Sequence, residues 1–368
     1  MNYVRSLDGL RALAVTLVLL FHYYYGSYWG FGWIGVQLFF VLSGFLITSI
    51  LLGAKDEPLD LYLRRFYWRR SLRIFPLYFA FVLGIAFIHV IAKFPENFPG
   101  IAPYLFTYTY NFEPLVNGYK VDFIFTHFWS LSVEEQFYLF WPFVIFFLNN
   151  AALRKFIIFI LVACPLVRFG MFQYLSAGNY NAADIGQLIY RFTPGQIDAF
   201  AYGALIPVFG LQNRPVNTGK LFVFGWAIFL VAGVINALAL LADGVSVNWL
   251  SLGYENGDTT NYQHVWTYMV VNFAAVTTIL YLLGSRTAIT AIFESAPAVL
   301  IGRVSYGMYV YHWPLRSFHL RYIDPHIQIS AISFAVYFLL VLLISYVSFQ
   351  LFESRILKLK DYKLRTAS

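Results

Sequence analysis

Apolar residues fill the chain in long runs, with short polar or charged segments between them. About ten runs approach 20 residues, the length that a helix needs to cross the hydrocarbon core of a bilayer. The runs lack the alternation of a transmembrane β-strand, and only helices or closed barrels satisfy backbone polar groups in lipid. The pattern therefore predicts an all-α polytopic membrane protein, with spans near residues 8–27, 34–53, 75–93, 130–149, 156–175, 193–211, 221–242, 265–284, 296–315 and 327–352.

Composition and charge agree with this class and add an orientation. Sixty per cent of the 368 residues are hydrophobic and 12% are charged. If both termini are cytoplasmic, 19 of the 25 Lys and Arg residues lie on the cytoplasmic side, as the positive-inside rule requires. The net charge of +7 then reflects membrane topology and gives no indication of a nucleic-acid partner. No repeat or long linker interrupts residues 1–368, so a single domain is expected.

The first apolar run, RALAVTLVLLFH, begins with a cation, Arg11, and ends with an imidazole, His22. Eleven residues of helix rise about 16 Å and turn almost three times, so both side chains lie on one face. Arg11 alone is explained by a positive-inside anchor that reaches the headgroups. His22 lies in the outer half of the span, where an ionisable side chain usually faces a partner or a cavity, although a histidine bonded between helices is the structural alternative.

A second candidate segment, LYLRRFYWRRSLRIFP at 61–76, carries five arginines among aromatic residues. Three of them, Arg64, Arg65 and Arg69, are better explained as anchors that hold an interfacial helix to anionic lipid. Arg70 and Arg73 are three residues apart and precede the span that follows Pro76. They could therefore bind the phosphates of a nucleotide-bearing ligand that enters from the cytoplasm.

A third segment, HFWSLSVEEQFYLFWP at 127–142, enters the membrane from outside with two adjacent carboxylates, Glu134 and Glu135. Adjacent helical residues point about 100° apart, so at most one is expected to face the bundle. Acidic residues in a first helical turn, capped by Ser130 or Ser132, are the structural alternative. At the outer depth of His22, a carboxylate would orient the imidazole as a general base. In GRVSYGMYVYHWP, 302–314, His312 is expected to be an interfacial histidine that supports the site.

Five segments, in this order, resemble the membrane acyltransferase 3 family: RSLDGLRALAVTLVLLFH, GVQLFFVLSGFLIT, RRSLRIFPLY, FWSLSVEEQFYLFWP and GRVSYGMYVYHWP. The resemblance covers nearly the whole chain. It implies a ten-helix bundle in a bacterial inner membrane that transfers an acyl group, usually acetyl, from cytoplasmic acyl-CoA to a hydroxyl across the membrane. The family motifs fall on the proposed cofactor-binding residues Arg11, Arg70, Arg73 and Ser43, with Gly44 beside the last, and on the proposed catalytic residues His22 and Glu134.

These lines combine into one functional hypothesis. Acetyl-CoA binds with its phosphates near the arginines, its arm extends toward His22, and His22 acts as base or transient acyl carrier with support from Glu134. No metal is implied. The expected acceptor is a cell-surface or lipid-linked glycan; a small lipophilic molecule such as a macrolide is the alternative, and a polytopic transporter is a more distant one. Some relatives carry an additional SGNH hydrolase domain, and a stand-alone form is expected here.

Overall fold

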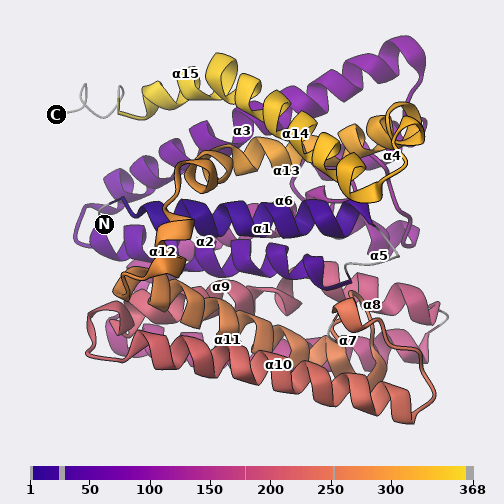
Figure 1. Ribbon diagram of the computed structural model, residues 1–368. Helices are drawn as coiled ribbons and strands as arrows, with labels where there is room; N and C mark the ends of the chain where they lie inside the picture. The colour runs from indigo at the N-terminus through magenta and orange to yellow at the C-terminus, as the bar shows by residue number, and fades with distance from the viewer. Residues whose placement is uncertain (1–2, 25–29, 179, 252, 362–368) are drawn as a thin grey trace. The chain divides into compact units, whose positions relative to one another are not determined.

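The computed structural model describes residues 3–24, 30–178, 180–251 and 253–361, and the regular structure in these ranges is helical throughout (Figure 1). Seven of the described helices are long and apolar enough to cross a membrane. They cover Arg5–Tyr23, Gly30–Gly53, Leu59–Ala92, Asn150–Ala177, Thr218–Ala242, Thr260–Gly284 and Ser330–Lys360. The predicted class, an all-helical multi-pass membrane protein, is confirmed.

The chain divides into two compact units, each built from two separate stretches of sequence. The α1 unit comprises Met1–Leu52 and Phe143–Arg303, and the α3 unit comprises Gly53–Pro142 and Val304–Ser368. Two helices, α6 (Phe128–Phe147) and α13 (Ala296–Tyr322), continue from one unit into the other. The two compact units do not test whether the chain works as one functional domain, so that expectation stays a prediction.

The α1 unit contains α1, α2 and the helices from α7 to α12, of which α10 and α11 run side by side (Figure 1). Asparagine side chains cap two of them: Asn149 accepts from the Ala152 N–H at α7, and Asn217 accepts from the Lys220 N–H at α10. The bounds are α1 Arg5–Tyr23, α2 Ile34–Gly53, α7 Asn150–Ala177, α8 Ala182–Arg191, α9 Ile197–Val208, α10 Thr218–Ala242, α11 Gln263–Gly284 and α12 Ala288–Phe293, with short 3-10 turns at Gly30–Trp33, Thr193–Gly195, Leu211–Asn213, Trp249–Ser251 and Thr260–Tyr262.

Two glycines allow α2 and α9 to cross in direct backbone contact. A β-carbon placed on Gly44 would lie 2.0 Å from the carbonyl oxygen of Phe200, and one on Gly203 would lie 1.9 Å from that of Val41. Small residues permit this close approach in membrane proteins, where packing must replace the missing hydrophobic drive. The glycine that follows Ser43 therefore has a packing role.

Gly44→Ala is expected to lower stability by about 1–3 kcal/mol, because the added methyl group must separate two well-packed helix backbones. Thermal unfolding of the detergent-purified variant measures the loss. Gly84→Ala in α3 is the matched control, since a β-carbon there meets no atom within 4 Å and alanine favours a helix by up to about 1 kcal/mol over glycine. Equal melting temperatures for the two variants would contradict this role of Gly44.

The α3 unit contains a long helix, two short helices that the apolar pattern did not predict, and the C-terminal helices. Its bounds are α3 Leu59–Ala92, α4 Phe98–Phe106, α5 Glu113–Asn117, α14 Ser330–Ser348 and α15 Ser354–Leu357, together with parts of α6 and α13, a 3-10 turn at Asp324–His326, a π-helical segment at Phe349–Glu353 and a final 3-10 turn at Lys358–Asp361. The π-helical segment joins α14 to α15 without a break.

Two predicted spans differ from the structure. The arginine segment and the span predicted at 75–93 form one helix, α3, with Pro76 inside it. Proline removes one backbone hydrogen bond, which neighbouring groups in a membrane protein can compensate, so the helix continues. The span predicted at 193–211 is divided instead: α9 has 12 residues, between 3-10 turns that hold Gly195 and follow Gly210.

Candidate active site

Arg11 and His22 lie on one unbroken helix, as the sequence predicts. Both belong to α1, and both are half-buried. The ring of His22 lies 5.3 Å from the ring of Phe21, measured between centroids. The rise of about 16 Å between the two functional residues therefore holds for the folded protein.

Arg11 is part of a charged network within the α1 unit. Its guanidinium forms an ion pair with Asp8, three residues earlier, and that carboxylate also accepts a hydrogen bond of 2.6 Å from the Tyr3 hydroxyl. The Tyr3 oxygen in turn accepts from Arg303 at 3.2 Å. The side chain of Asp8 is only 6% exposed, whereas that of Arg11 is 21% exposed. One buried carboxylate therefore fixes Arg11 while leaving part of its guanidinium accessible.

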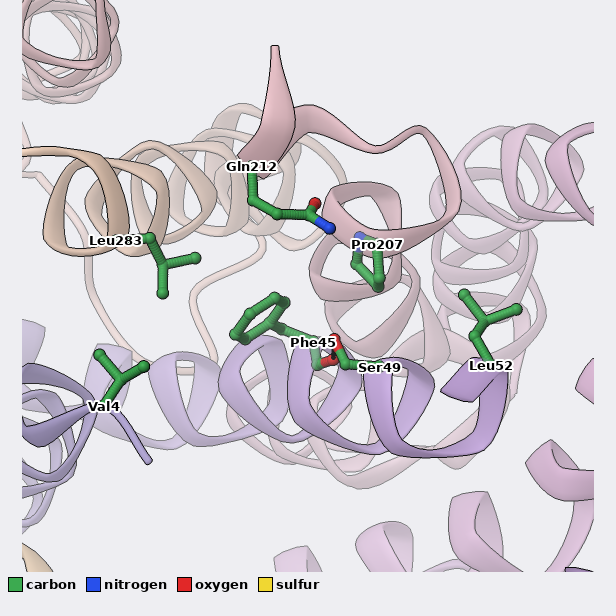
Figure 2. A pocket seen from close by; sticks show the side chains of 7 residues that line it. All are labelled: Val4, Phe45, Ser49, Leu52, Pro207, Gln212 and Leu283. Carbon is green, nitrogen blue, oxygen red and sulfur yellow. Dashed lines mark hydrogen bonds between the residues drawn. The ribbon is translucent and has the colours of Figure 1, made fainter. Parts of the chain in front are cut away.

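A pocket of about 480 Å³ lies near the end of α2 (Figure 2). Its lining side chains converge from three helices, a 3-10 turn and the residue before α1, and they are Val4, Phe45, Ser49, Leu52, Pro207, Gln212 and Leu283. The Ser49 hydroxyl already donates to the Phe45 carbonyl oxygen at 2.7 Å. Since most of the wall is apolar, the pocket suits an apolar group better than a phosphate. Ser43, on the same helix, is not one of the lining residues.

In the α3 unit, Tyr138 connects Arg70 to Glu134. The Arg70 guanidinium carbon lies 4.3 Å from the centre of the Tyr138 ring, a cation–π distance. The Tyr138 hydroxyl donates a hydrogen bond to the Glu134 carboxylate, one helical turn earlier on α6. A cation, a phenol and a carboxylate thus form one continuous group.

This arrangement corrects one expectation. The charge count places Arg70 at the cytoplasmic mouth and Glu134 one membrane leaflet away. In the structure both contact Tyr138. Arg70 of α3 thus lies beside the middle of α6.

The two carboxylates are not helix caps. Helix α6 begins at Phe128, so Glu134 and Glu135 are its seventh and eighth residues, beyond the first turn. Both are half-buried, and one oxygen of Glu135 is fully buried. Both side chains are therefore partly covered by protein, and the expectation that at most one of them faces the bundle stays a prediction.

Arg73 interacts with the carboxylate of Glu353, to which the sequence analysis assigned no function. Arg73 itself is exposed, and it interacts electrostatically with Glu353 at the end of the π-helical segment. Glu353 is 8% exposed, and Ser348 donates to its Oε1 atom at 3.2 Å. Arg73, the second arginine of the pair, thus lies near the buried carboxylate of Glu353.

His312 is fully buried, in contrast to the interfacial position expected for it. Its Nδ1 lies 2.6 Å from the carbonyl oxygen of Tyr309, so this nitrogen carries the proton. Its ring lies 4.6 Å from the ring of His127, which the sequence analysis did not single out, and the Tyr309 hydroxyl donates to the His127 carbonyl oxygen at 3.0 Å. These bonds identify His312 as part of a packed α6–α13 contact.

Another missed feature is an ion pair inside the α1 unit. Arg168 of α7 and Asp198 of α9 are both 0% exposed, and their charged atoms lie 2.8 Å apart. The Arg168 guanidinium also lies over the ring of Tyr268 and donates to the Val265 carbonyl oxygen at 3.2 Å. The pair ties α7, α9 and α11 together.

Comparison with known proteins supplies the family. The model of the acyltransferase 3 family, described as an acyltransferase domain, matches residues 4–349. The peptidoglycan O-acetyltransferase OatA of Listeria monocytogenes is 29% identical over 97% of this chain and 56% of its own length. The O-acetyltransferase OatA of Staphylococcus aureus is 26% identical over 98% of this chain and 58% of its own length. The chain thus spans little more than half the length of these relatives, and no solved structure matches it.

Proposed function

Because this chain belongs to the acyltransferase 3 family, we propose that it is a membrane O-acetyltransferase. The donor is acetyl-CoA from the cytoplasm, and the acceptor is a hydroxyl of a cell-surface or lipid-linked glycan. The observation that carries the proposal is the family match itself, which runs through every helix that bears a predicted site residue. The name of the Listeria relative, a peptidoglycan O-acetyltransferase, supports a glycan acceptor over a macrolide.

His22 is proposed as the base of this reaction. Its imidazole takes the proton of the acceptor hydroxyl, the oxygen forms a bond to the acetyl carbon, the carbon–sulfur bond breaks, and the CoA thiolate leaves. A transient acyl group on His22 is the two-step version of the same transfer. Glu134 is proposed to support the base, and Ser43 to contact the donor.

The arginines are proposed to hold the donor. Arg11, Arg70 and Arg73 supply cationic hydrogen-bond donors, which bind phosphate oxygens more strongly than neutral groups do. The contact of Arg70 with Tyr138, and of Tyr138 with Glu134, gives donor binding a physical connection to the acidic motif. No metal is required for any of these steps.

The direct test uses purified protein in nanodiscs with acetyl-labelled CoA. Transfer of the label to peptidoglycan fragments or to a lipid-linked saccharide, as an alkali-labile ester, is the expected result. Transfer of the label to a macrolide alone would support the transferase activity and refute the glycan acceptor. Neither transfer nor hydrolysis of acetyl-CoA above a protein-free control would refute the proposal.

The direction of transfer depends on a topology of ten spans with both termini in the cytoplasm of a bacterial cell, in its inner membrane. In a Cys164→Ala background, Ser246→Cys is expected to react with an impermeant thiol reagent added to intact spheroplasts, and Asn213→Cys is expected to stay unlabelled. Both positions are exposed in the α1 unit, so accessibility reports sidedness. The matched control is labelling after lysis, when both cysteines should react. The reverse pattern in intact spheroplasts would overturn the topology.

A further inference from the structure

Among the described residues of the α3 unit, eight buried side-chain polar atoms have no hydrogen-bond partner, and two of them belong to residues that interact with each other. One is the hydroxyl of Tyr108, a residue that is 8% exposed, and the other is an oxygen of the Glu135 carboxylate. Buried polar groups are almost always bonded, because leaving them unpaired in a dry interior is costly. One of these atoms can donate and the other can only accept.

Hydrogen bonds connect the backbone of Tyr108 to the helical turn of α6 that carries Glu135. Gln136, the next residue after Glu135, donates to the Tyr108 carbonyl oxygen at 2.8 Å and to Asn111 Oδ1 at 2.9 Å. The Tyr108 ring stacks on the Tyr78 ring, with centroids 4.3 Å apart. Tyr108 also has a φ of 53°, which a bulky residue rarely adopts. Packing thus fixes the phenol in one position although the backbone there is unfavourable.

The hydroxyl groups of two nearby tyrosines donate to backbone carbonyl oxygens and not to Glu135. Tyr78 donates to the Leu105 carbonyl oxygen at 2.8 Å, and Tyr306 donates to the Ile74 carbonyl oxygen at 2.9 Å. Both phenols lie within electrostatic range of Glu135, as does Tyr108. Of these three phenols, Tyr108 is the one whose hydroxyl has no hydrogen-bond partner.

The position of this pair relative to Arg70 indicates its ligand. Arg70 interacts electrostatically with Glu135, and Tyr78 lies eight residues beyond Arg70 on α3, a rise of about 12 Å. A ligand whose phosphates bind Arg70 and whose arm follows α3 reaches the pair from the arginine side. The pantetheine arm of CoA carries amide groups, each of which presents one N–H donor and one carbonyl acceptor in a fixed plane.

We propose that Glu135 and Tyr108 form an amide-binding subsite for the pantetheine arm of the acyl donor. The Glu135 oxygen accepts the amide N–H, and the Tyr108 hydroxyl donates to the amide carbonyl. The subsite rests on the proposed function, since it assumes a CoA donor at Arg70. It assigns to Glu135 and Tyr108 a binding role distinct from the one proposed for Glu134.

The test compares two ligands by calorimetry on protein in nanodiscs. CoA contains the arm, and adenosine 3′,5′-bisphosphate lacks it. Tyr108→Phe, which removes only the hydroxyl, is expected to weaken CoA binding roughly tenfold, the effect of losing about one hydrogen bond to a buried group, while binding of the bisphosphate is unchanged. Glu135→Leu also removes a charge that interacts with Arg70, so for this variant the expected result is a roughly tenfold loss of CoA binding relative to bisphosphate binding. Tyr104→Phe, in α4 of the same unit, is the control and should bind both ligands like wild type.

The outcomes separate this subsite from the transferase proposal. If CoA binding is unchanged in Tyr108→Phe, or if both ligands weaken equally, the subsite is refuted, even when acetyl transfer by the wild type proceeds. If the selective loss is seen but no acetyl is transferred, the subsite holds and the transferase proposal fails. Absence of CoA binding by the wild type would refute both. Melting temperatures of all variants identify any loss of folded protein.

Discussion

His22→Ala is expected to reduce acetyl transfer by about 10²–10⁴-fold, the usual contribution of a positioned general base. Without the imidazole, the acceptor hydroxyl must lose its proton to water in the transition state. Because His22 is half-buried near the end of α1, the substitution should leave the helix and the fold intact. Release of CoA thiol and label transfer from acetyl-CoA, measured at saturating donor, give the rate.

His326→Ala provides the matched control, since this imidazole is exposed in the turn that follows α13 and lies apart from the motifs. It should turn over like wild type. Label that stays on quenched wild-type protein but not on His22→Ala would identify the covalent version of the reaction. Normal turnover by His22→Ala would remove His22 from the catalytic site.

Local sequence patterns predicted the features that depend on one helix at a time. The apolar runs located α2, α10 and α11 to within a few residues, because a lipid-exposed or buried membrane helix must be apolar over its whole length. The shared face of Arg11 and His22 follows from helical geometry alone and needed no tertiary information. The Arg11–Asp8 ion pair was equally local, at a spacing of three residues, and could have been predicted.

Features that depend on two distant segments were not predictable in this way. Arg70 and Tyr138 lie 68 positions apart, and nothing in either segment specifies the other as its partner. The packing of α3 on α6 brings the two side chains together. Arg168 and Asp198 were missed for the same reason: each is an isolated charge in an apolar stretch, and only the packing of α7 on α9 pairs them.

Neutralising both arginines of the second motif, in Arg70→Gln/Arg73→Gln, is expected to raise the Kd for acetyl-CoA by about 10²-fold or more. Each charge-assisted hydrogen bond to phosphate contributes about 1.5–3 kcal/mol, and the variant loses at least two. Calorimetry on purified protein of matched fold measures the change. Arg64→Gln, an exposed position on the same helix, is the control and should bind like wild type.

The structure changes what the single variants of this motif should do. Arg73 is exposed and interacts with Glu353, so Arg73→Gln should raise the Kd and leave kcat nearly unchanged. Arg70 lies on the Tyr138 ring, and Tyr138 bonds Glu134, so Arg70→Gln should raise the Kd and lower kcat together. Glu134→Gln should lower kcat with little change in donor affinity. The alternative is that the arginines anchor the helix to anionic lipid. In that case the double variant would lose membrane insertion or stability, while its folded fraction would bind acetyl-CoA like wild type. That result would remove both arginines from the donor site.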